Sequence, residues 1–464
     1  MQAPARVREA LAGIAPLPGS IATIADLCQL HLNKGTPAMR THRALLASLA
    51  LLAAPACVRP LETGTLEEQP FEFQVRSPTM AALQAAIDAC PRGYNQRQRG
   101  CQIRLPSGTI RGHWTIGGDA GNTVQVGVCL IGQGPGHGST LPGGKPGAAG
   151  TTLVYEGLKG GTLLDFAGGD YPCVRDVTLA MDGAAVGLRL RGGNTPIQNP
   201  MLERVTIAGD ATKPAGIGLL ITGPTNNDQV DALLADELKI DHVDVGIEVA
   251  SNQALTNRIG PGSKIAAQSA AVRIRGGSLS LDGVLAQCMT ENCCTYDLLP
   301  GHGYFRVRDG YHEIGLPAPD ITLLCLSRDA PEGVGGWHMV SIVESYFNVQ
   351  CDASKKPCFV DLIHGRSNVG VVFRDNWIAS SQPDPKNIGR TFANVVFSTP
   401  AGAKSPARLV WEGNMVSSAM GGIQAKIGPN TRVEALTSDG SRIWNDTNLD
   451  GLWEKSEPAI SVQP

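Results

Sequence analysis

Residues 79–109 read TMAALQAAIDACPRGYNQRQRGCQIRLPSGT and hold the most informative pattern in the chain. The first half has the apolar spacing of an amphipathic helix. After a short loop, the second half reads as a strand that ends in Pro-Ser-Gly. A stack of strand coils cannot leave its first hydrophobic layer exposed to water. The segment therefore predicts a helix that caps a stack of strands.

One phrase recurs in the rest of the chain: an apolar strand, an acidic residue beside a small or polar one, and a second apolar strand. The copies at Asp176 and Glu203 are 27 residues apart, and those at Glu344 and Asp375 are 31 apart. Repeats of this size, with inward aliphatic residues alternating with outward polar ones, indicate a solenoid. A β-sandwich would instead need evenly spaced Asn-Gly or Asp-Gly hairpin turns, and the chain has few Asp-Gly pairs. The repeat therefore favours the solenoid.

The helix motif LQAAIDA (83–89) and the strand motif IRLPSGT (103–109) resemble the opening of a known group of proteins. That group is the pectate-lyase-like superfamily of right-handed parallel β-helix proteins, which includes polysaccharide lyases and glycoside hydrolases. The resemblance covers roughly residues 71–445. It implies an all-β fold, a right-handed parallel β-helix with an N-terminal α-helical cap. We expect the β-helix domain to span residues 79–464, with the cap at 79–109.

Composition excludes some partners. The formal net charge is −3, which gives no basic footprint for nucleic acid and no polybasic patch for an anionic membrane surface. The chain has 56 glycines and only 5% aromatic residues, which suits many tight turns around aliphatic stacks. We expect a monomer whose partner is a polysaccharide, with no nucleic acid and no integral membrane span.

The N-terminal region carries an export signal. Residues 39–43 are basic, residues 44–53 (ALLASLALLA) are apolar, and 54–56 give the small-x-small pattern of a cleavage site. The apolar run is too short to span a bilayer. We therefore expect an upstream extension at 1–38, a signal peptide at 39–56 and a linker at 57–78, in a secreted or periplasmic protein. Cys57 directly after the expected cleavage site leaves an outer-surface lipoprotein as the alternative.

Cysteine usage agrees with export. Ten of the twelve cysteines lie beyond residue 80, an even number that indicates disulfides in an exported chain. Cys90 and Cys101 flank the loop of the cap, and Cys351 and Cys358 bracket a polar turn, so each pair could close a short loop. A zinc site is the alternative for four others, although they lack a C-x-x-C pair and a completing histidine: Cys288, Cys293, Cys294 and Cys325.

The recurring acidic residues are the first candidates for chemistry. In a solenoid their regular place would stack them about 5 Å apart. Six unpaired carboxylates so close together would repel one another, which argues against a catalytic row. We interpret them as residues that bend the chain through side-chain to backbone hydrogen bonds. They are Asp176, Glu203, Asp282, Glu344, Asp375 and Glu412.

A second candidate is the segment from Asn226 to Glu237, which departs from the strand phrase. Glycoside hydrolysis needs paired carboxylates, and Asp228, Asp231 and Asp236 could supply them. The resemblance adds two partial motifs, an Asn-x-Asp at 226–228 and a Gly-His-Gly at 301–303, but no Asp-Asp pair follows. We assign no metal, although one cluster offers the oxygen ligands that a calcium ion would need: Asp228, Asp231, Asp236, Asp241 and Asp244.

A third candidate lies in the C-terminal half. Polysaccharide elimination needs a base beside a uronate carboxylate and a cation that neutralises it. Tyr, His and Arg side chains suit these roles. We predict catalytic roles for Tyr311, His312 and Glu313, and we expect them to lie outside the core. We predict substrate binding by Trp337, His338, His364 and Arg366.

From the sequence we expect a secreted carbohydrate-active protein with a groove along a β-helix that binds a polysaccharide. We predict an enzyme that cleaves this polysaccharide by hydrolysis or β-elimination. The alternative is a non-catalytic surface or adhesive solenoid that binds glycans, which would explain the incomplete motifs.

Overall fold

A computed structural model describes most of the chain beyond residue 70. The expected extension at 1–38, the signal peptide at 39–56, Cys57 and most of the linker lie outside the described residues. Among the described residues, no helix is long and apolar enough to cross a membrane. The described ranges are 71–92, 100–117, 127–134, 150–193, 195–223, 228–314, 321–328, 330–331, 333–349, 358–380, 391–417, 420, 422–428, 430–436 and 443–445.

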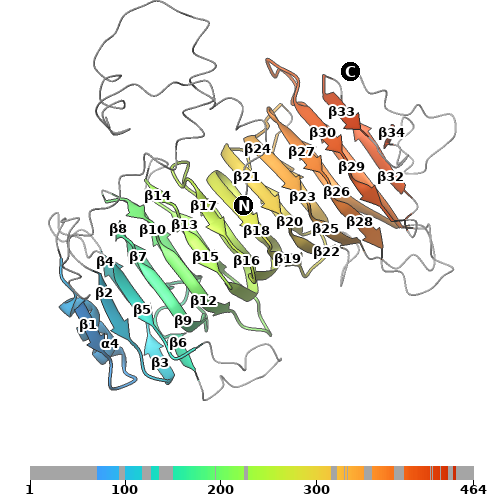
Figure 1. Cartoon of the computed structure of the whole chain (residues 1–464). Helices are drawn as coiled ribbons and strands as arrows, with labels where there is room; N and C mark the ends of the chain where they lie inside the picture. Colours follow the sequence, from blue (N-terminus) through green and yellow to red (C-terminus); the bar gives the residue numbers. More distant parts are fainter. Residues whose placement is uncertain are drawn as a thin grey trace, which may run out of the picture. The chain divides into compact units, whose positions relative to one another are not determined.

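The described chain is nearly all β, with one helix and parallel strands stacked side by side (Figure 1). Successive coils of the chain pair in register with one another, and the strands form three parallel ladders. Ladder 1 pairs β1 (Phe71–Gln74), β2 (Cys101–Arg104), β5 (Val128–Ile131), the start of β9 (Cys173–Ala180), the start of β12 (Met201–Ala208), β15 (Leu234–Asp236), β17 (Asn257–Ile259), the end of β18 (Lys264–Asp282), β21 (His302–Arg308), β24 (Trp337–Val343), β27 (Gly370–Arg374), β30 (Arg408–Glu412) and β33 (Arg432–Leu436).

Ladder 2 follows ladder 1 after a bend, and ladder 3 closes each coil before the chain returns to ladder 1. Ladder 2 pairs β3 (Gly108–Gly112), β6 (Thr151–Tyr155), the ends of β9 and β12, the start of β16 (Lys239–Ala250), the start of β18, β19 (Leu285–Cys288), β22 (Tyr311–Ile314), β25 (Tyr346–Val349), β28 (Trp377–Ser380) and β31 (Met415–Val416).

Ladder 3 carries most of the charged side chains discussed below. It pairs β4 (Trp114–Gly117), β7 (Thr162–Ala167), β10 (Val186–Arg191), β13 (Ile217–Thr222), the end of β16, the middle of β18, β20 (Cys294–Leu298), β23 (Thr322–Leu326), β26 (Cys358–Arg366), β29 (Thr391–Ser398), β32 (Gly422–Ile427) and β34 (Ile443–Asn445). A small separate sheet holds β8 (Gly169–Asp170), β11 (Ile197–Gln198) and β14 (Val230–Asp231).

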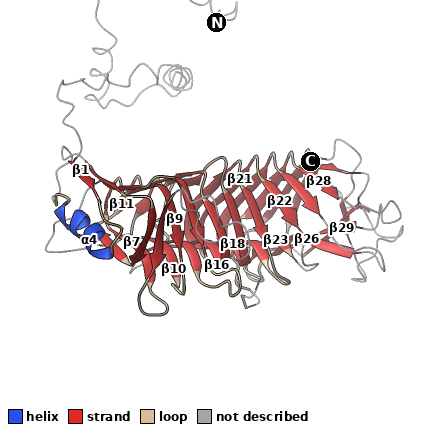
Figure 2. Cartoon of the chain, turned by 90° about the horizontal axis from the view of Figure 1, so that it is seen from below, coloured by secondary structure: helices blue, strands red, loops and turns tan. Residues whose placement is uncertain are grey.

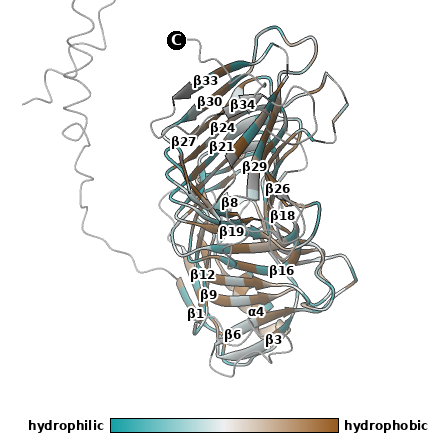
Figure 3. Ribbon diagram, turned by 90° about the vertical axis from the view of Figure 1, so that its right-hand side faces the viewer, coloured by the Kyte–Doolittle hydropathy of each residue, from teal (hydrophilic) through white to brown (hydrophobic). Residues whose placement is uncertain are grey.

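The core is built from the inward residues of the three ladders. Along β21, for example, Phe305 and Val307 are buried while Arg308 is exposed, so hydrophobic and hydrophilic residues mix along single strands (Figure 3). Aromatic side chains stack from coil to coil inside. The ring of Phe373 lies 5.4 Å from Phe347 and 4.7 Å from Trp411. Each coil thus buries its apolar face on its neighbours, as the repeat predicts.

The bend between ladders 1 and 2 has a left-handed residue in most coils. Asp176, Glu344 and Asp375 occupy it, with φ of 57°, 53° and 55°. The prediction that all six recurring acids share one position is wrong, because the other three lie one residue earlier, at the ends of ladder 1 strands. At several coils this one-residue offset sets a carboxylate beside an arginine. Arg204 Nε donates to Asp176 Oδ1 over 2.6 Å, and Arg308 Nε donates to Glu344 Oε2 over 2.8 Å.

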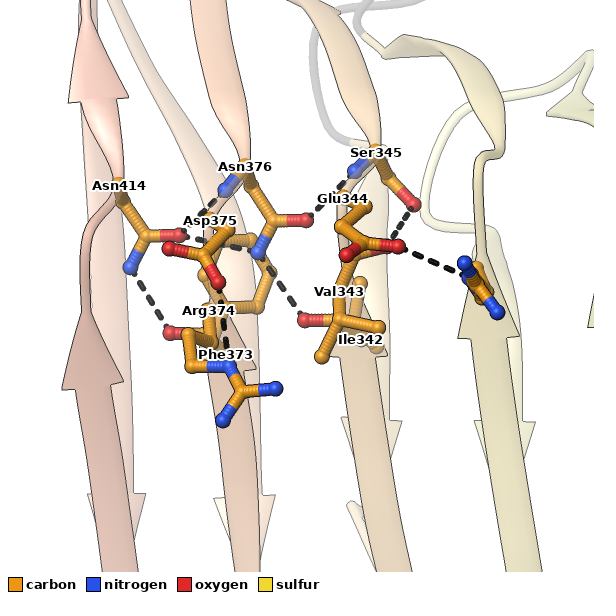
Figure 4. Close-up of polar contacts among 10 residues, drawn as sticks. Ile342, Val343, Glu344, Ser345, Phe373, Arg374, Asp375, Asn376 and Asn414 are labelled. Carbon is orange, nitrogen blue, oxygen red and sulfur yellow. Dashed lines mark hydrogen bonds and ion pairs between the residues drawn. The ribbon is translucent and has the colours of Figure 1, made fainter. Parts of the chain in front are cut away.

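The side-chain to backbone bonds that we expected from the acids come instead from the residue that follows the bend position (Figure 4). Asn376 Oδ1 accepts from the backbone N–H of Ser345, and Asn414 Oδ1 accepts from the N–H of Asn376, both over 3.0 Å. The amide groups of Asn376 and Asn414 donate to the carbonyls of Ile342 and Phe373, over 3.0 and 2.8 Å. A buried amide ladder therefore satisfies the backbone at the bend, as buried polar groups require.

The predicted helix is α4 (Met80–Ala89). Thr79 caps it by accepting the N–H of Ala82 over 3.3 Å, and Leu83 and Ile87 are buried. Figure 2 shows the helix at one end of the strands, near β1. Phe71–Gln74, within the expected linker, pair with β2 as strand β1.

Four disulfides join described residues. Cys90–Cys101 confirms the expected staple between the helix and β2, and Cys129–Cys173 joins β5 to β9. The zinc interpretation is wrong, because its four cysteines are bonded in two pairs, Cys288–Cys293 and Cys294–Cys325. The expected Cys351–Cys358 pair falls outside the residues whose side chains are described.

Candidate active site

The outward face of ladder 3 carries a row of opposite charges in register. Arg189 binds Asp165 with two guanidinium nitrogens, Nε and Nη2, over 2.9 and 2.6 Å. Arg273 donates to Asp297 over 2.9 Å, and its guanidinium lies 3.9 Å from Glu248. Cross-strand pairs of this kind stabilise a sheet. Because arginines hold these carboxylates, this part of the row offers no free acid or base.

The row continues, beyond Cys325, to a histidine on β26. His364 Nδ1 lies 2.7 Å from Asp361 Oδ2, and Asn394 Nδ2 donates to Asp361 Oδ1 over 3.0 Å. A carboxylate that accepts the Nδ1–H fixes the tautomer of the imidazole and leaves Nε2 free to take a proton. The side chain of His364 is 39% exposed. The group is therefore suited to general base chemistry at the surface.

A cation lies beside this base. Arg366 follows His364 by two residues on the same face of β26, roughly 7 Å along the strand. Its Nη2 donates to the carbonyl of Ala330 over 2.7 Å, which fixes the guanidinium in place. Gly365 between them has φ of 136°, and a Cβ there would lie 2.0 Å from the carbonyl oxygen of Leu326. A glycine is therefore needed at that position.

A pocket of about 530 Å³ opens where ladder 3 turns into ladder 1. Its lining includes Asn252, Arg275 and Gly301. Arg275 is 52% exposed and donates from Nε to Glu248 Oε1 over 2.8 Å, so it presents a cation to the pocket while its charge is partly balanced. The pocket is in the size range that holds a small ligand or a few linked units of one.

Two aromatic side chains lie next to the pocket, along the same turn. Trp337, at the start of β24, stacks on His302 of β21, with centroids 6.2 Å apart and an interplanar angle of 13°. Trp337 is 51% exposed. The structure thus places Trp337, one of the residues predicted to bind substrate, at the surface beside the pocket. Arg366, another of them, lies at the same turn, two coils beyond the pocket wall.

His338, also predicted to bind substrate, lies beneath this surface. It is 2% exposed, its Nε2 is 2.9 Å from the carbonyl oxygen of Leu299, and burial lowers the pKa of its imidazole. The Gly-His-Gly motif has a packing explanation too. A Cβ at Gly301 or Gly303 would lie 1.8 Å from a backbone carbonyl oxygen of the preceding coil.

The predicted group on β22 is not brought to this site, because β22 belongs to ladder 2. Tyr311 and Glu313 point outward, but His312 is fully buried. Its ring stacks on Phe347 with centroids 4.9 Å apart and lies 3.2 Å from the Tyr296 hydroxyl. Burial lowers the pKa of His312 to about 4. The prediction that His312 lies outside the core is wrong, since strand alternation turns it inward between two outward neighbours.

The aspartates of the second candidate segment are also spread out. Asp231 lies on β14 of the small sheet, and its Oδ1 accepts the N–H of Leu255 over 2.9 Å. Asp236 ends β15 of ladder 1, and the backbone carbonyl of Asp228 accepts the Ser251 hydroxyl over 2.7 Å. Asn226 and Asn227 lie outside the described residues. Within the described part of the chain, no cluster of three or more His, Cys, Asp or Glu residues could hold a metal ion.

Sequence reasoning missed Asp361 and Asn394. Residues three apart on a regular strand point to opposite faces, so Asp361 and His364 gave no pairing signal. A register shift between Asp361 and Ile363 in the pairing of β26 with β29 changes that parity and brings the two side chains together. Bulges of this kind often re-aim a side chain beside a functional site.

No family model matches the chain, and no curated protein matches it. Solved structures of carbohydrate-active enzymes do resemble it, as the sequence resemblance led us to expect. An alginate lyase from Paenibacillus sp. is 12% identical, with a TM-score of 0.31, and the match covers 67% of this chain and 93% of that one. The catalytic domain of a GH87 α-1,3-glucanase is 11% identical, with a TM-score of 0.42 and coverage of 80% and 69%. A DFA-IIIase from Arthrobacter chlorophenolicus is 12% identical, with a TM-score of 0.41 and coverage of 85% and 100%.

Proposed function

We propose that this chain is an exported, right-handed β-helix protein that binds an acidic polysaccharide and cleaves it by β-elimination. In this proposal α4 closes the N-terminal end of the helix by covering its first coil. Four disulfides support a secreted or periplasmic location, because such bonds persist in oxidising compartments.

The observation that carries the reaction is the His364–Asp361 contact of 2.7 Å with Arg366 on the same strand face. Nε2 of His364 takes the proton beside the uronate carboxylate, while Arg366 stabilises the negative charge that develops there. The electron pair of the broken C–H bond forms the new double bond, and the glycosidic C–O bond on the next carbon breaks. The leaving oxygen takes a proton from water, and the hydroxide that remains takes back the proton that His364 Nε2 removed. Asp361 and Asn394 position the imidazole.

The pocket and its aromatic neighbours would hold the sugars that flank the cleaved bond. Arg275 offers a second cation for a uronate carboxylate, and Asn252 offers amide hydrogen bonds. The exposed ring of Trp337 offers an apolar surface for a sugar ring. Hydrolysis has less support at this site, since it needs a pair of free carboxylates. Asp165, Glu248 and Asp297 are bound to arginines, and Asp361 is bound to His364 and Asn394.

A panel of polysaccharides tests the proposal. Release of unsaturated uronate, seen by its ultraviolet absorbance, is expected on at least one acidic polymer. His364→Asn should lower the rate by about 10²–10⁴, the range for loss of a general base. His242→Asn is the matched control, because His242 also lies beside an aspartate, at 3.4 Å, but on ladder 2. Reducing ends without unsaturation would replace elimination with hydrolysis.

The second candidate is a non-catalytic glycan-binding solenoid. The observation in its favour is that Asp165, Glu248 and Asp297 are all compensated by arginine, as in a structural sheet face. Polysaccharide binding without any cleavage product would support this candidate.

A further inference from the structure

Ladder 2 carries a second surface. Ladder 1 separates it along the chain from the turn that holds the pocket. Tyr311, Tyr346 and Trp377 lie in register on three successive coils and form an aromatic strip. The two tyrosine rings stack with centroids 5.2 Å apart, and the Tyr346 and Trp377 rings meet edge to face at 5.3 Å. Trp377 is 51% exposed and Tyr311 is 38% exposed. Neither the fold nor the proposed reaction requires these rings at the surface.

The strip continues in both directions along the same outward row. Met415 follows Trp377 and is 55% exposed, and Leu285 precedes Tyr311. Before Leu285 the row holds two exposed lysines, Lys264 and Lys239. The row from Lys239 to Met415 covers six strand spacings, about 29 Å. A partner that fits it is therefore long and narrow.

The charged residues along and beside the strip indicate the kind of partner that would bind it. Within the described part of the chain, neither Lys239 nor Lys264 forms an ion pair, so no carboxylate there holds either ammonium group. Along the bend beside the strip, the carboxylates of Glu344 and Asp375 are held by arginines, at 2.8 and 3.2 Å. Glu313 lies at the opposite edge, two residues beyond Tyr311. The strip is thus cationic towards Lys239 and aromatic towards Trp377.

We infer that this strip binds a second stretch of an acidic polysaccharide, with carboxylates towards Lys239 and Lys264 and sugar rings against the aromatic side chains. The C–H face of a sugar ring is apolar while its hydroxyls form hydrogen bonds, and tyrosine and tryptophan offer both kinds of contact. A second copy of the chain fits less well. A stable dimer buries about 800 Å² on each partner, and this row is one side chain wide between charged edges. The inference rests on the proposed substrate class but not on the proposed cleavage.

Binding measured without cleavage tests the inference. The parent is the His364→Ala variant of the full chain, and the probes are alginate, polygalacturonate and a neutral α-1,3-glucan in affinity electrophoresis. Trp377→Ala and Tyr311→Ala should each weaken binding of an acidic polymer about tenfold. Lys264→Gln should weaken it and reduce its dependence on salt. Tyr171→Ala is the control, since Tyr171 is a 62% exposed aromatic residue outside ladder 2.

The possible outcomes separate a failure of this inference from a failure of the proposed function. Binding of the acidic polymers unchanged in all three strip variants would overturn the inference, even if the wild-type chain cleaves its substrate as proposed. A strip that binds the neutral glucan as tightly as the acidic polymers would overturn the charge assignment. A dimer in solution that Trp377→Ala dissociates would make the strip a subunit interface instead. A wild-type chain that neither binds nor cleaves any acidic polymer would overturn the proposed function and the inference together.

Discussion

The same bend is stabilised in two different ways in two parts of the molecule. In the coils around Asp176 and Arg204, charged side chains bridge neighbouring coils on the outside, and both are partly exposed to solvent. In the coils from Ser345 to Asn414, amide side chains bridge the coils on the inside, and Asn376 and Asn414 are 0% and 2% exposed. The backbone geometry is alike, with φ of 57° at Asp176 and 55° at Asp375. What differs is whether water competes for the polar groups, and this decides how much each contact contributes to the free energy of unfolding.

The largest effect is expected at the buried amide ladder. Asn376→Ala removes the acceptor of the Ser345 N–H and leaves the carbonyl of Ile342 without its donor. Buried groups left unsatisfied cost about 1–3 kcal/mol each, so the free energy of unfolding should fall by roughly 3–5 kcal/mol. Denaturant unfolding followed by circular dichroism measures it. A loss below about 1 kcal/mol would show that water replaces the amide and that the two bends are equivalent.

The next effect is acid destabilisation through His312, which is buried in the coil before the amide ladder. Its pKa is lowered by burial to about 4 from an ordinary 6.5. A base with a lowered folded pKa stabilises the fold while neutral, above its unfolded pKa, and this stability is lost as pH falls from about 6.5 towards 4. Between pH 7 and pH 5 the contribution should drop by about 2 kcal/mol. His312→Gln does not titrate, so the stability gap between the two proteins should shift by that amount in the variant's favour.

A pH-independent gap between wild type and His312→Gln would contradict this. It would mean that the imidazole has the same pKa in the folded and unfolded states. Because other groups titrate in both proteins alike, the comparison isolates His312 from the general loss of stability in acid.

The smallest effect is expected at the exposed bend. Asp176→Asn removes the charge that Arg204 binds over 2.6 Å, while asparagine keeps the left-handed backbone accessible. Pairs in contact with water contribute about 0–1 kcal/mol and are screened by salt. The loss should stay below about 1 kcal/mol and shrink further in high salt, whereas the effect of Asn376→Ala should not respond to salt. A large, salt-independent loss at Asp176 would remove the distinction between the two bends.

The predicted export of the protein is tested by a separate measurement. Because the signal peptide is expected to end at residue 56, the mature chain should begin at Cys57. Mass spectrometry of the secreted or cell-envelope protein gives this N-terminus, and a diacylglyceryl mass on Cys57 would identify a lipoprotein. An N-terminus at Met1 in exported material would overturn the prediction.

Much of the fold was determined by patterns local to the sequence. The apolar spacing of 80–89 and the threonine before it specify α4, because a helix needs only an amphipathic face and a capped end. The recurring strand phrase specifies parallel stacking, because each coil must bury its apolar face on a copy of itself. The Cys90–Cys101 bond followed from a short loop between two fixed elements.

Other features depended on register between coils, which sequence spacing does not reveal. Whether a carboxylate meets an arginine or another carboxylate depends on a shift of one residue, as Glu203 and Arg204 show. The direction of His312 depended on strand parity, and the meeting of His364 with Asp361 depended on a single bulge. The sequence alone therefore determined the repeating architecture, since that follows from hydrophobic periodicity. Only the tertiary structure decided which polar side chains meet, since that requires the alignment of strands distant in the chain.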